Sequence, residues 1–297
     1  MTLVVAFGAG LVAALLAWWA ISAWWRWDAG APQMDANRVA ATVEEHEGLA
    51  RRLRQRLDPT VATGSLLAAA GGILVLGGGA LGVLVIMVRS KTGFYRFDAA
   101  ATRFGARHAT TLTTDVLRVV TQIGGAVVIV PLAIVVGLIE VWRRRRWSPA
   151  LFLTIVVGGQ FALANLIKLA VDRTRPNLLR LTGFSGPSFP SGHATASAAT
   201  FVAFALLAGR GRSRTTKGML AASAVGLAVT VSATRVLLGV HWLTDVTAGL
   251  ILGWTWFAFT SIAFGGRLLR FGAPVETAER VAESTTDRPE HARASRG

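Results

Sequence analysis

The sequence predicts an all-α fold, a polytopic bundle of transmembrane helices. The chain of 297 residues is 53% hydrophobic and only 16% charged, and its mean hydropathy is +0.50. Its apolar residues gather in several runs of about 20, the length that an α-helix needs to cross the hydrocarbon core of a bilayer. Soluble globular domains carry roughly a quarter charged residues, so this composition indicates an integral membrane protein.

The charge and the absence of Cys exclude several functions. In a soluble protein, a net charge of +15 would suggest a nucleic-acid partner. Here the arginines cluster in short loops between apolar runs, where membrane topology explains them, so we expect the bilayer and no nucleic acid as a partner. Because the chain has no Cys, it has no disulfide, no thiol nucleophile and no Cys-based metal site.

The first apolar run covers residues 2–25 and ends in a cluster of tryptophans, which favour the membrane interface. No Lys or Arg precedes it, so the charged start of a cleavable signal peptide is missing and we expect an uncleaved span. Six further spans are expected to form a core, to which the first span is an addition. They cover residues 61–88, 118–141, 148–169, 191–209, 218–238 and 241–264.

Three polar segments connect or follow these spans. Residues 35–58 place apolar side chains at helical spacing, which predicts a short amphipathic helix on the cytoplasmic side. Residues 89–117 mix apolar and charged side chains, and we expect them to lie along the outer surface. From Gly272 the chain is polar and poor in aromatics, which is typical of a disordered tail.

The distribution of basic residues predicts the orientation. With the N-terminus outside, the cytoplasmic segments contain 20 of the 31 Lys and Arg residues, in agreement with the positive-inside rule. These segments are 26–60, 142–147, 210–217 and 265–297. The C-terminus is then cytoplasmic, and the loop before Pro190 and the start of the last span both face the extracytoplasmic side.

The residues that suggest chemistry lie in two stretches, and the first begins at Lys168. Lys168 stands near the outer end of a span, where it suits either an anion site or a lysine that reaches back to the membrane interface. Arg175 follows seven residues later, and Pro176 ends any helix at that point. Taken alone, this arginine is an ordinary loop residue.

The first stretch ends in Pro190-Ser191-Gly192-His193, which opens a helix of small residues. Ser191 suits the N-cap position, so the N–H groups that follow it have no partner within the helix. Such a helix N-terminus favours an anion. A simple helix start with a surface histidine is the alternative, and the basic loop that leads to this point weighs against it.

The second stretch contains Arg235, His241 and Asp245. If His241 begins the last helix, Asp245 lies one turn later on the same face. The carboxylate can then hold one imidazole nitrogen and leave the other free and more basic. An interfacial His–Asp pair without catalytic work is the alternative, but a carboxylate inside an apolar helix requires a partner.

Together these residues suit phosphoryl transfer. Arginines and a lysine clamp the phosphate oxygens, one imidazole attacks phosphorus, and the other protonates the leaving oxygen. The sequence offers no acidic cluster for Mg²⁺, so we expect no metal and no cofactor, and the cations neutralise the phosphate charge.

Three motifs in this order resemble the three signatures of the type 2 phosphatidic acid phosphatase (PAP2) family, which shares its site with vanadium haloperoxidases. The resemblance covers about residues 61–264, with Thr234 where the family usually has Ser. It implies that His241 is the nucleophile and forms a phosphohistidine, that Asp245 orients it, and that His193 is the general acid. The phosphate-binding residues that it implies are Lys168, Arg175, Arg235 and the turn at Ser191 and Gly192. The motifs are Lys168-x6-Arg175-Pro176, Pro190-Ser191-Gly192-His193 and Thr234-Arg235-x5-His241-x3-Asp245.

The function we expect is that of a metal-independent lipid phosphate phosphatase in the cell membrane, with its site on the extracytoplasmic face. Phosphatidic acid, phosphatidylglycerol phosphate and polyprenyl diphosphate all fit as substrates. Arg173 and Arg180 hint at a diphosphate, or else contact anionic headgroups. A haloperoxidase is one alternative, although those relatives resemble soluble proteins. A non-catalytic protein that binds or transports lipid phosphates is the other, although it would not need both histidines and Asp245.

The resemblance also suggests a division into domains. The expected domains are residues 1–60 with the first span and the cytoplasmic helix, 61–264 with the six-span catalytic core, and 265–297 as a disordered cytoplasmic tail.

Overall fold

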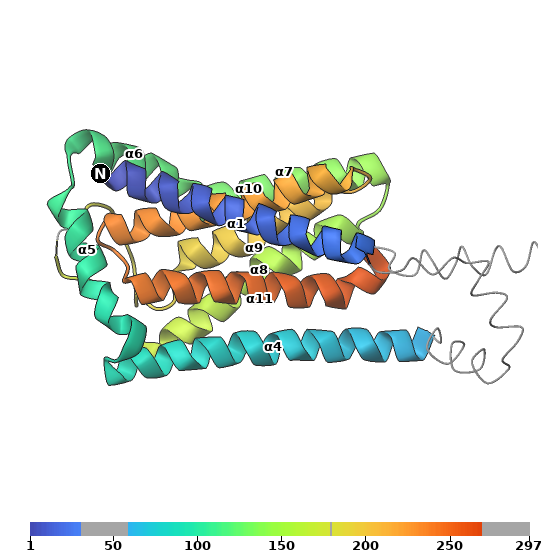
Figure 1. Ribbon diagram of the computed structural model, residues 1–297, viewed down its shortest axis with the longest axis horizontal. Helices are drawn as coiled ribbons and strands as arrows, with labels where there is room; N and C mark the ends of the chain where they lie inside the picture. Colours follow the sequence, from blue (N-terminus) through green and yellow to red (C-terminus); the bar gives the residue numbers. More distant parts are fainter. Residues whose placement is uncertain (31–58, 179, 269–297) are drawn as a thin grey trace, which may run out of the picture. The chain divides into compact units, whose positions relative to one another are not determined.

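The computed structural model describes residues 1–30, 59–178 and 180–268 (Figure 1). The amphipathic helix predicted for residues 35–58 and the tail from residue 269 onward lie outside this part, so both stay predictions. The chain divides into two compact units, Met1–Gln33 with Gly71–Thr260 and Met34–Ala70 with Ser261–Gly297. In the second unit the structure describes only the beginning of one helix and the end of another. The contacts reported below all lie within the first unit.

The described residues contain helices and no strands, which confirms the predicted all-α class. The helices are α1 (Thr2–Gly30), α4 (Pro59–Ser90), the 3₁₀ helix η1 (Gly93–Phe97), α5 (Asp98–Arg107), α6 (Thr111–Gln122), α7 (Ala126–Arg144), α8 (Ser148–Val171), α9 (Gly192–Ala208), α10 (Arg214–Leu237) and α11 (Leu243–Leu268).

Six segments of the described chain are long and apolar enough to cross a membrane, as expected for a multi-pass protein. They are Thr2–Trp24, Ala70–Ser90, Thr111–Arg144, Ser148–Val171, Arg214–Leu237 and Leu243–Phe264. The remaining predicted span corresponds to α9, which is apolar but shorter, with 17 residues. Their positions agree with the seven runs that the sequence predicts.

The predicted span 118–141 is a pair of helices. α6 begins earlier, because Thr110 and Thr113 form a capping box at its N-terminus, and it ends at Gln122. Gly124 and the N-cap Gly125 then form a turn before α7 begins. The N-terminal part of this segment is therefore a separate helix, and its end lies beside the site described below.

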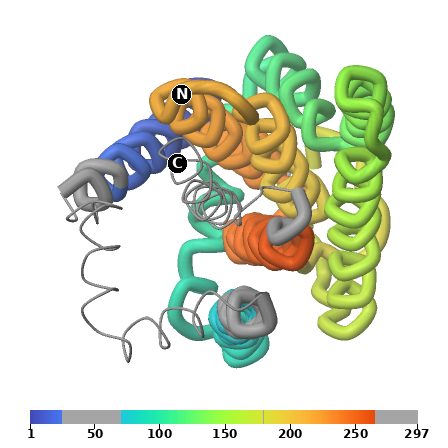
Figure 2. Tube along the Cα trace, turned by 90° about the vertical axis from the view of Figure 1, so that its right-hand side faces the viewer, coloured from blue at the N-terminus to red at the C-terminus, as the bar shows by residue number. Residues whose placement is uncertain are grey.

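α9 is the most deeply buried helix of the first unit, and it packs against α7, α8 and α10 (Figure 2). Most of its first ten residues are buried, and they are small. α11 crosses it closely, because a Cβ at Gly249 would come within 2.7 Å of Ser191 O and one at Gly253 within 2.5 Å of Thr195 O. Small residues allow helix backbones to approach in this way in membranes. This crossing brings the second and third motifs together.

The N-terminal helix α1 packs along α10. Ala6 belongs to a buried apolar cluster with Leu117, Leu238 and Val240, and Leu3 packs against it. Leu238 and Val240 lie in the turn that leads to His241, so this additional span supports the same end of the bundle as the motifs.

Candidate active site

The structure brings the eight predicted site residues to one end of the first unit. Lys168 lies near the end of α8, Arg175 in the loop after it, Arg235 near the end of α10, and Asp245 in the first turn of α11. Ser191 is the N-cap of α9, and Gly192 and His193 begin that helix.

His241 lies in the turn between α10 and α11 and not in the last helix, which begins at Leu243. The backbone N–H groups of Val240 and His241 both donate to Arg235 O, and Gly239 allows the turn with a φ of +71°. The prediction that His241 and Asp245 lie one turn apart in the same helix was therefore wrong, although the two side chains do lie close together. His241 Nδ1 lies 3.5 Å from Asp245 Oδ2, so the two groups face each other, but Nδ1 makes no hydrogen bond within the described residues.

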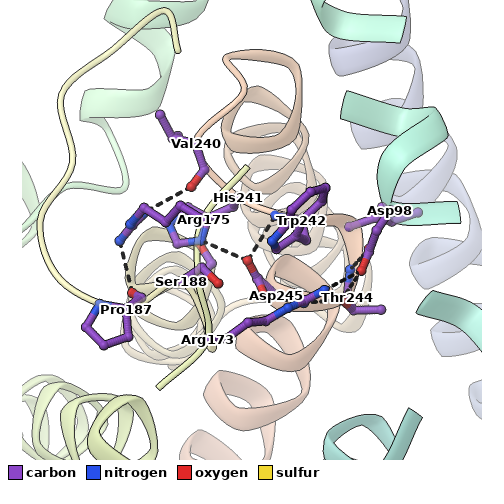
Figure 3. A network of polar contacts seen from close by, with 12 residues as sticks. Asp98, Arg173, Arg175, Pro187, Ser188, Val240, His241, Trp242, Thr244 and Asp245 are labelled. Carbon is purple, nitrogen blue, oxygen red and sulfur yellow. Dashed lines mark hydrogen bonds and ion pairs between the residues drawn. The ribbon is translucent and has the colours of Figure 1, made fainter. Parts of the chain in front are cut away.

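The partners of His241 define which of its nitrogens is free to react (Figure 3). Arg175 Nη1 lies 3.1 Å from His241 Nε2, and a guanidinium can only donate. Nε2 is therefore the acceptor, and the proton of the neutral ring is on Nδ1, which faces Asp245. This tautomer leaves the Nε2 lone pair toward Arg175 and the site, as a nucleophile requires.

Burial lowers the pKa of His241 to about 4. The hydrogen-bonding capacity and charge of Asp245 raise this pKa, and the charges of Arg175 and Arg235 lower it further. The imidazole is consequently neutral at physiological pH.

Arg175 organises the loop as well as the site. Its Nη1 donates to Val240 O at 2.8 Å in addition to His241. Its Nε and Nη2 donate to the carbonyl oxygens of Gly186, Ser185 and Pro187 at 2.8, 2.8 and 3.1 Å. All five guanidinium donors are used, so this side chain fixes the loop against the turn that carries His241.

Lys168, Arg175 and Arg235 form a cationic group without a carboxylate partner among the residues that the structure describes. Lys168 is within electrostatic range of both arginines, and His193 is within range of all three cations and of His241. Lys168 Nζ also lies 3.7 Å from the position that a Cβ would take at Gly192. Convergent cations without a carboxylate partner in a partly buried place favour an anion between them.

Two orphaned polar atoms point to the same need. Arg235 is buried, and although its Nη1 donates to Thr121 Oγ1 at 3.2 Å, its Nε has no partner in the described structure. Ser191 occupies the predicted N-cap position, but its buried Oγ makes no capping bond and also has no partner there. Both atoms are able to bind the oxygens of a phosphate placed among the cations.

The break between α6 and α7 adds residues that the motifs do not contain. A Cβ at Gly125 would lie 3.4 Å from His193 Nε2, so this backbone closes the site beside the second histidine. Thr121 in α6 accepts the bond from Arg235. Neither residue has a pattern in the sequence that sets it apart from an ordinary span.

Arg173 corrects one hint from the sequence. Its side chain is buried and its guanidinium binds Asp245 and Asp98, so it is not free to hold a second phosphate. Arg180 is exposed and uses its Nε for Pro176 O, while its guanidinium stacks on Phe184. Of the two arginines, only Arg180 remains for the diphosphate hypothesis.

Asp98, the buried acid that Arg173 binds, was missed by sequence reasoning. It begins α5, where an acidic residue is common for reasons of helix capping alone. Its partners lie 75 and 146 residues further along the chain. No local pattern could have identified it.

Comparisons with known proteins show that the chain is similar to phosphatases, in agreement with a site that is suited to bind phosphate. A family model described as the PAP2 superfamily matches residues 149–268. The lipid A 1-phosphatase of Rhizobium etli is 39% identical over 124 residues, which are 38% of this chain and 49% of that protein. The chain thus spans about half the length of that relative. The phosphatidylglycerophosphatase B of Bacillus subtilis is 32% identical over 159 residues, which are 53% of this chain and 77% of that protein.

A third relative and one solved structure are also similar. The decaprenylphosphoryl-5-phosphoribose phosphatase of Mycobacterium tuberculosis is 37% identical over 139 residues, covering 42% of this chain and 65% of that protein. The crystal structure of a transmembrane PAP2 type phosphatidylglycerolphosphate phosphatase from Bacillus subtilis matches with a TM-score of 0.61 and 27% identity. The match covers 66% of this chain and 98% of that chain.

Proposed function

The chain belongs to the PAP2 superfamily, and on this premise we propose that it is an integral-membrane phosphatase that hydrolyses a lipid phosphate. The observation that supports this most is the group of three cations around two histidines, one of which faces Asp245 at 3.5 Å. A protein that only binds lipid phosphates would need the cations. It would not need His241 in the tautomer that exposes Nε2.

We propose the following first step. A phosphate enters between the cations. The N–H group of Arg175 Nη1 that faces His241 Nε2 then donates its hydrogen bond to a phosphate oxygen instead. Nε2 then attacks phosphorus, the bond from phosphorus to the ester oxygen breaks, and His193 gives its proton to the leaving oxygen. The products of this step are a lipid alcohol and a phosphohistidine at residue 241, whose Nδ1 proton faces Asp245.

Hydrolysis of the phosphohistidine completes the reaction. His193, now neutral, takes a proton from a water molecule as the water attacks phosphorus, and the bond to Nε2 breaks. Inorganic phosphate leaves, and Arg175 returns to His241. Lys168, Arg175 and Arg235 stabilise the charge on the phosphate oxygens in both steps, which is the work that a metal ion performs in other phosphatases.

The substrate we propose carries its phosphate on a membrane anchor. The site lies at the ends of membrane-spanning helices, so a lipid can reach it while its tail stays in hydrocarbon. A cavity of about 460 Å³ beside Arg175 is lined by Arg180, Phe184 and Pro187. This cavity offers space for the part of the headgroup beyond the reacting phosphate. The distribution of basic residues supports an extracytoplasmic site and a cytoplasmic C-terminus.

The experiment that tests this proposal measures phosphate release by the purified protein in mixed micelles with EDTA present. The substrates are phosphatidic acid, phosphatidylglycerol phosphate, a polyprenyl diphosphate and a soluble phosphate ester. We expect turnover of at least one lipid at a rate above that of the soluble ester. His241→Ala should abolish turnover and the phosphohistidine. In His193→Ala, we expect an ester with a good leaving group to restore the first step in part.

The outcomes separate the alternatives. Undiminished turnover by a folded His241→Ala protein contradicts the nucleophile, and a strict need for Mg²⁺ contradicts the role of the cations. Tight binding of lipid phosphates without turnover would favour a binding or transport protein.

A further inference from the structure

A buried bridge of three charged side chains lies behind His241 (Figure 3). Arg173 Nη1 donates to Asp245 Oδ1 at 2.6 Å, and Arg173 Nη2 donates to Asp98 Oδ2 at 2.7 Å. Asp98 is the first residue of α5, Arg173 belongs to the loop after α8, and Asp245 to the first turn of α11. The bridge joins three segments that are distant in the sequence.

Thr244 completes the hydrogen bonds of the bridge. Its N–H donates to Asp98 Oδ1 at 2.8 Å and its hydroxyl donates to Asp98 Oδ2 at 2.7 Å. Arg173 Nη1 also donates to this hydroxyl, at 2.6 Å. The side chains of Asp98, Arg173 and Asp245 are all less than a tenth exposed, so each depends on the others for compensation of its charge.

Two aromatic rings fix the direction of Arg173. Its guanidinium carbon lies 5.5 Å from the ring centre of Tyr95 and 5.4 Å from that of Trp242. Trp242 is tied in turn, because its N–H donates to Asp245 Oδ2 and its Nε1 to Thr174 O, both at 2.9 Å. The guanidinium is therefore held against the two carboxylates.

The charge of the bridge explains why it contains two acids. If Arg173 had Asp245 as its single partner, it would neutralise the carboxylate that faces His241. With Asp98 as a second partner, the three side chains carry a net charge of about −1. The ring of His241 becomes positive when Nε2 bonds to phosphorus while Nδ1 keeps its proton. The net negative charge of the bridge stabilises this positive ring, because Asp245 Oδ2 faces His241 Nδ1.

We propose that Asp98 is a positioning residue for the reaction, which through Arg173 keeps Asp245 both oriented and effectively anionic against His241. The inference rests on the proposed phosphatase function and deepens it. It adds α5, which none of the three motifs includes, to the elements that build the site. It also gives Arg173 a role at the site other than binding phosphate.

Turnover by the full chain tests the role of Asp98 through Asp98→Asn. We expect kcat to fall by about tenfold to a hundredfold, the size of loss found when carboxylates that orient metal-bound histidines are removed. KM should stay nearly unchanged, because no contact to the phosphate is lost. Asp115→Asn is the matched control, since Asp115 is an exposed acid on the neighbouring helix and pairs with the exposed Arg118. This control should keep the wild-type kcat.

The pH profile separates positioning from simple support of the fold. His241 is faced by Arg175 from the loop, Arg235 from α10, His193 from α9 and Asp245 from α11, and none of these changes in the variant. Loss of one negative charge from the bridge lowers the pKa of His241, so the acidic limb of kcat/KM should move to lower pH in Asp98→Asn.

A double variant provides the decisive comparison. Asp98→Asn with Arg173→Gln removes one negative and one positive charge, so the bridge again carries about −1 and the acidic limb should return toward its wild-type position. A purely structural role predicts that the double variant is at least as damaged as the single one and that its limb does not return. That result would overturn the proposal.

A measurement that does not depend on turnover distinguishes the role of Asp98 from the phosphatase function. The ring resonances of His241 can be titrated in the labelled full-length protein in micelles and assigned by their loss in His241→Gln. We expect the midpoint of His241 to be lower in Asp98→Asn than in the wild type and in Asp115→Asn. If no lipid is turned over by the wild type but the midpoint shifts, the phosphatase proposal fails and the bridge remains. If turnover is found but neither kcat nor the midpoint changes, Asp98 is not a positioning residue.

Discussion

His241 combines deep burial with a site crowded by positive charge, and this combination determines where it titrates. Burial lowers its pKa to about 4, against about 6.5 for an exposed histidine. A nucleophilic imidazole must be neutral, so a lowered pKa extends its useful range toward acid. The carboxylate of Asp245 limits the lowering, which in the proposed mechanism keeps the ring basic enough to attack phosphorus.

The pH dependence of the wild-type protein should reflect this pKa. We expect the acidic limb of kcat/KM to lie near pH 4 and not near 6.5, with a second limb at higher pH where the general acid loses its proton. Because the folded protein binds fewer protons than the unfolded chain between pH 4 and about 6.5, stability should also fall as the pH drops through this range. Initial rates and thermal unfolding across pH 3–9 check both expectations. An acidic limb at 6.5 would mean that His241 is solvated or is not the nucleophile.

At the level of single residues, the sequence was informative where chemistry requires fixed spacing. Lys168, Arg175, His193 and Arg235 could be identified because each stands at a set distance from a Pro, a helix start or another polar residue. Asp98 could not, because its importance arises from a contact across 146 residues with Thr244. Such a contact is a product of tertiary packing and leaves no local pattern.

At the level of elements, α1 is connected to the site through α10. A Cβ at Gly10 would come within 1.9 Å of Thr230 Oγ1 and 2.8 Å of Gly226 O, so the two helices touch at their backbones. The same contact brings Ala6 against Leu238 and Val240, the turn that precedes His241. The additional span therefore supports the turn that carries His241.

Gly10→Leu should separate α1 from α10. Overpacking of a close crossing costs on the order of 1–3 kcal/mol, so we expect a lower Tm and, because the turn before His241 loses its support, a lower kcat. Gly8→Leu is the matched control, since no other part of the described chain lies within 4 Å of a Cβ there. Thermal unfolding in micelles and turnover compare the two variants. Equal Tm values for Gly10→Leu and Gly8→Leu would contradict the crossing.

The details of the elements that the sequence did not reveal share a physical cause. Hydropathy shows where the chain is apolar, but it does not show where a helix is interrupted. The turn at Gly124 and Gly125 could therefore not be recognised within the predicted span 118–141. The start of the last helix was placed at His241 because the spacing to Asp245 fitted one turn. The backbone N–H of His241 instead donates to Arg235 O, which continues the turn from α10.

At the level of the whole molecule, the orientation in the membrane remains a prediction. The loop with Ser185 should face the extracytoplasmic side, whereas Ser213, the N-cap of α10, should face the cytoplasm. The chain has no Cys, so a single Cys at either position reports one place only. A membrane-impermeant thiol reagent added to intact cells should label Ser185→Cys and not Ser213→Cys. Labelling of both from the same side would show that the number of spans or the orientation is wrong.

The bridge of Asp98, Arg173 and Asp245 has a consequence for recombination between relatives. The segment that matches the family model, residues 149–268, contains the arginine and one acid but not the other acid. A chimera that exchanges this segment alone inherits a buried guanidinium whose second counter-ion must come from the host. If the crossover lies before α5, all three charged residues come from the same parent protein. If it lies between α5 and α8, Asp98 comes from one parent, and Arg173 and Asp245 come from the other.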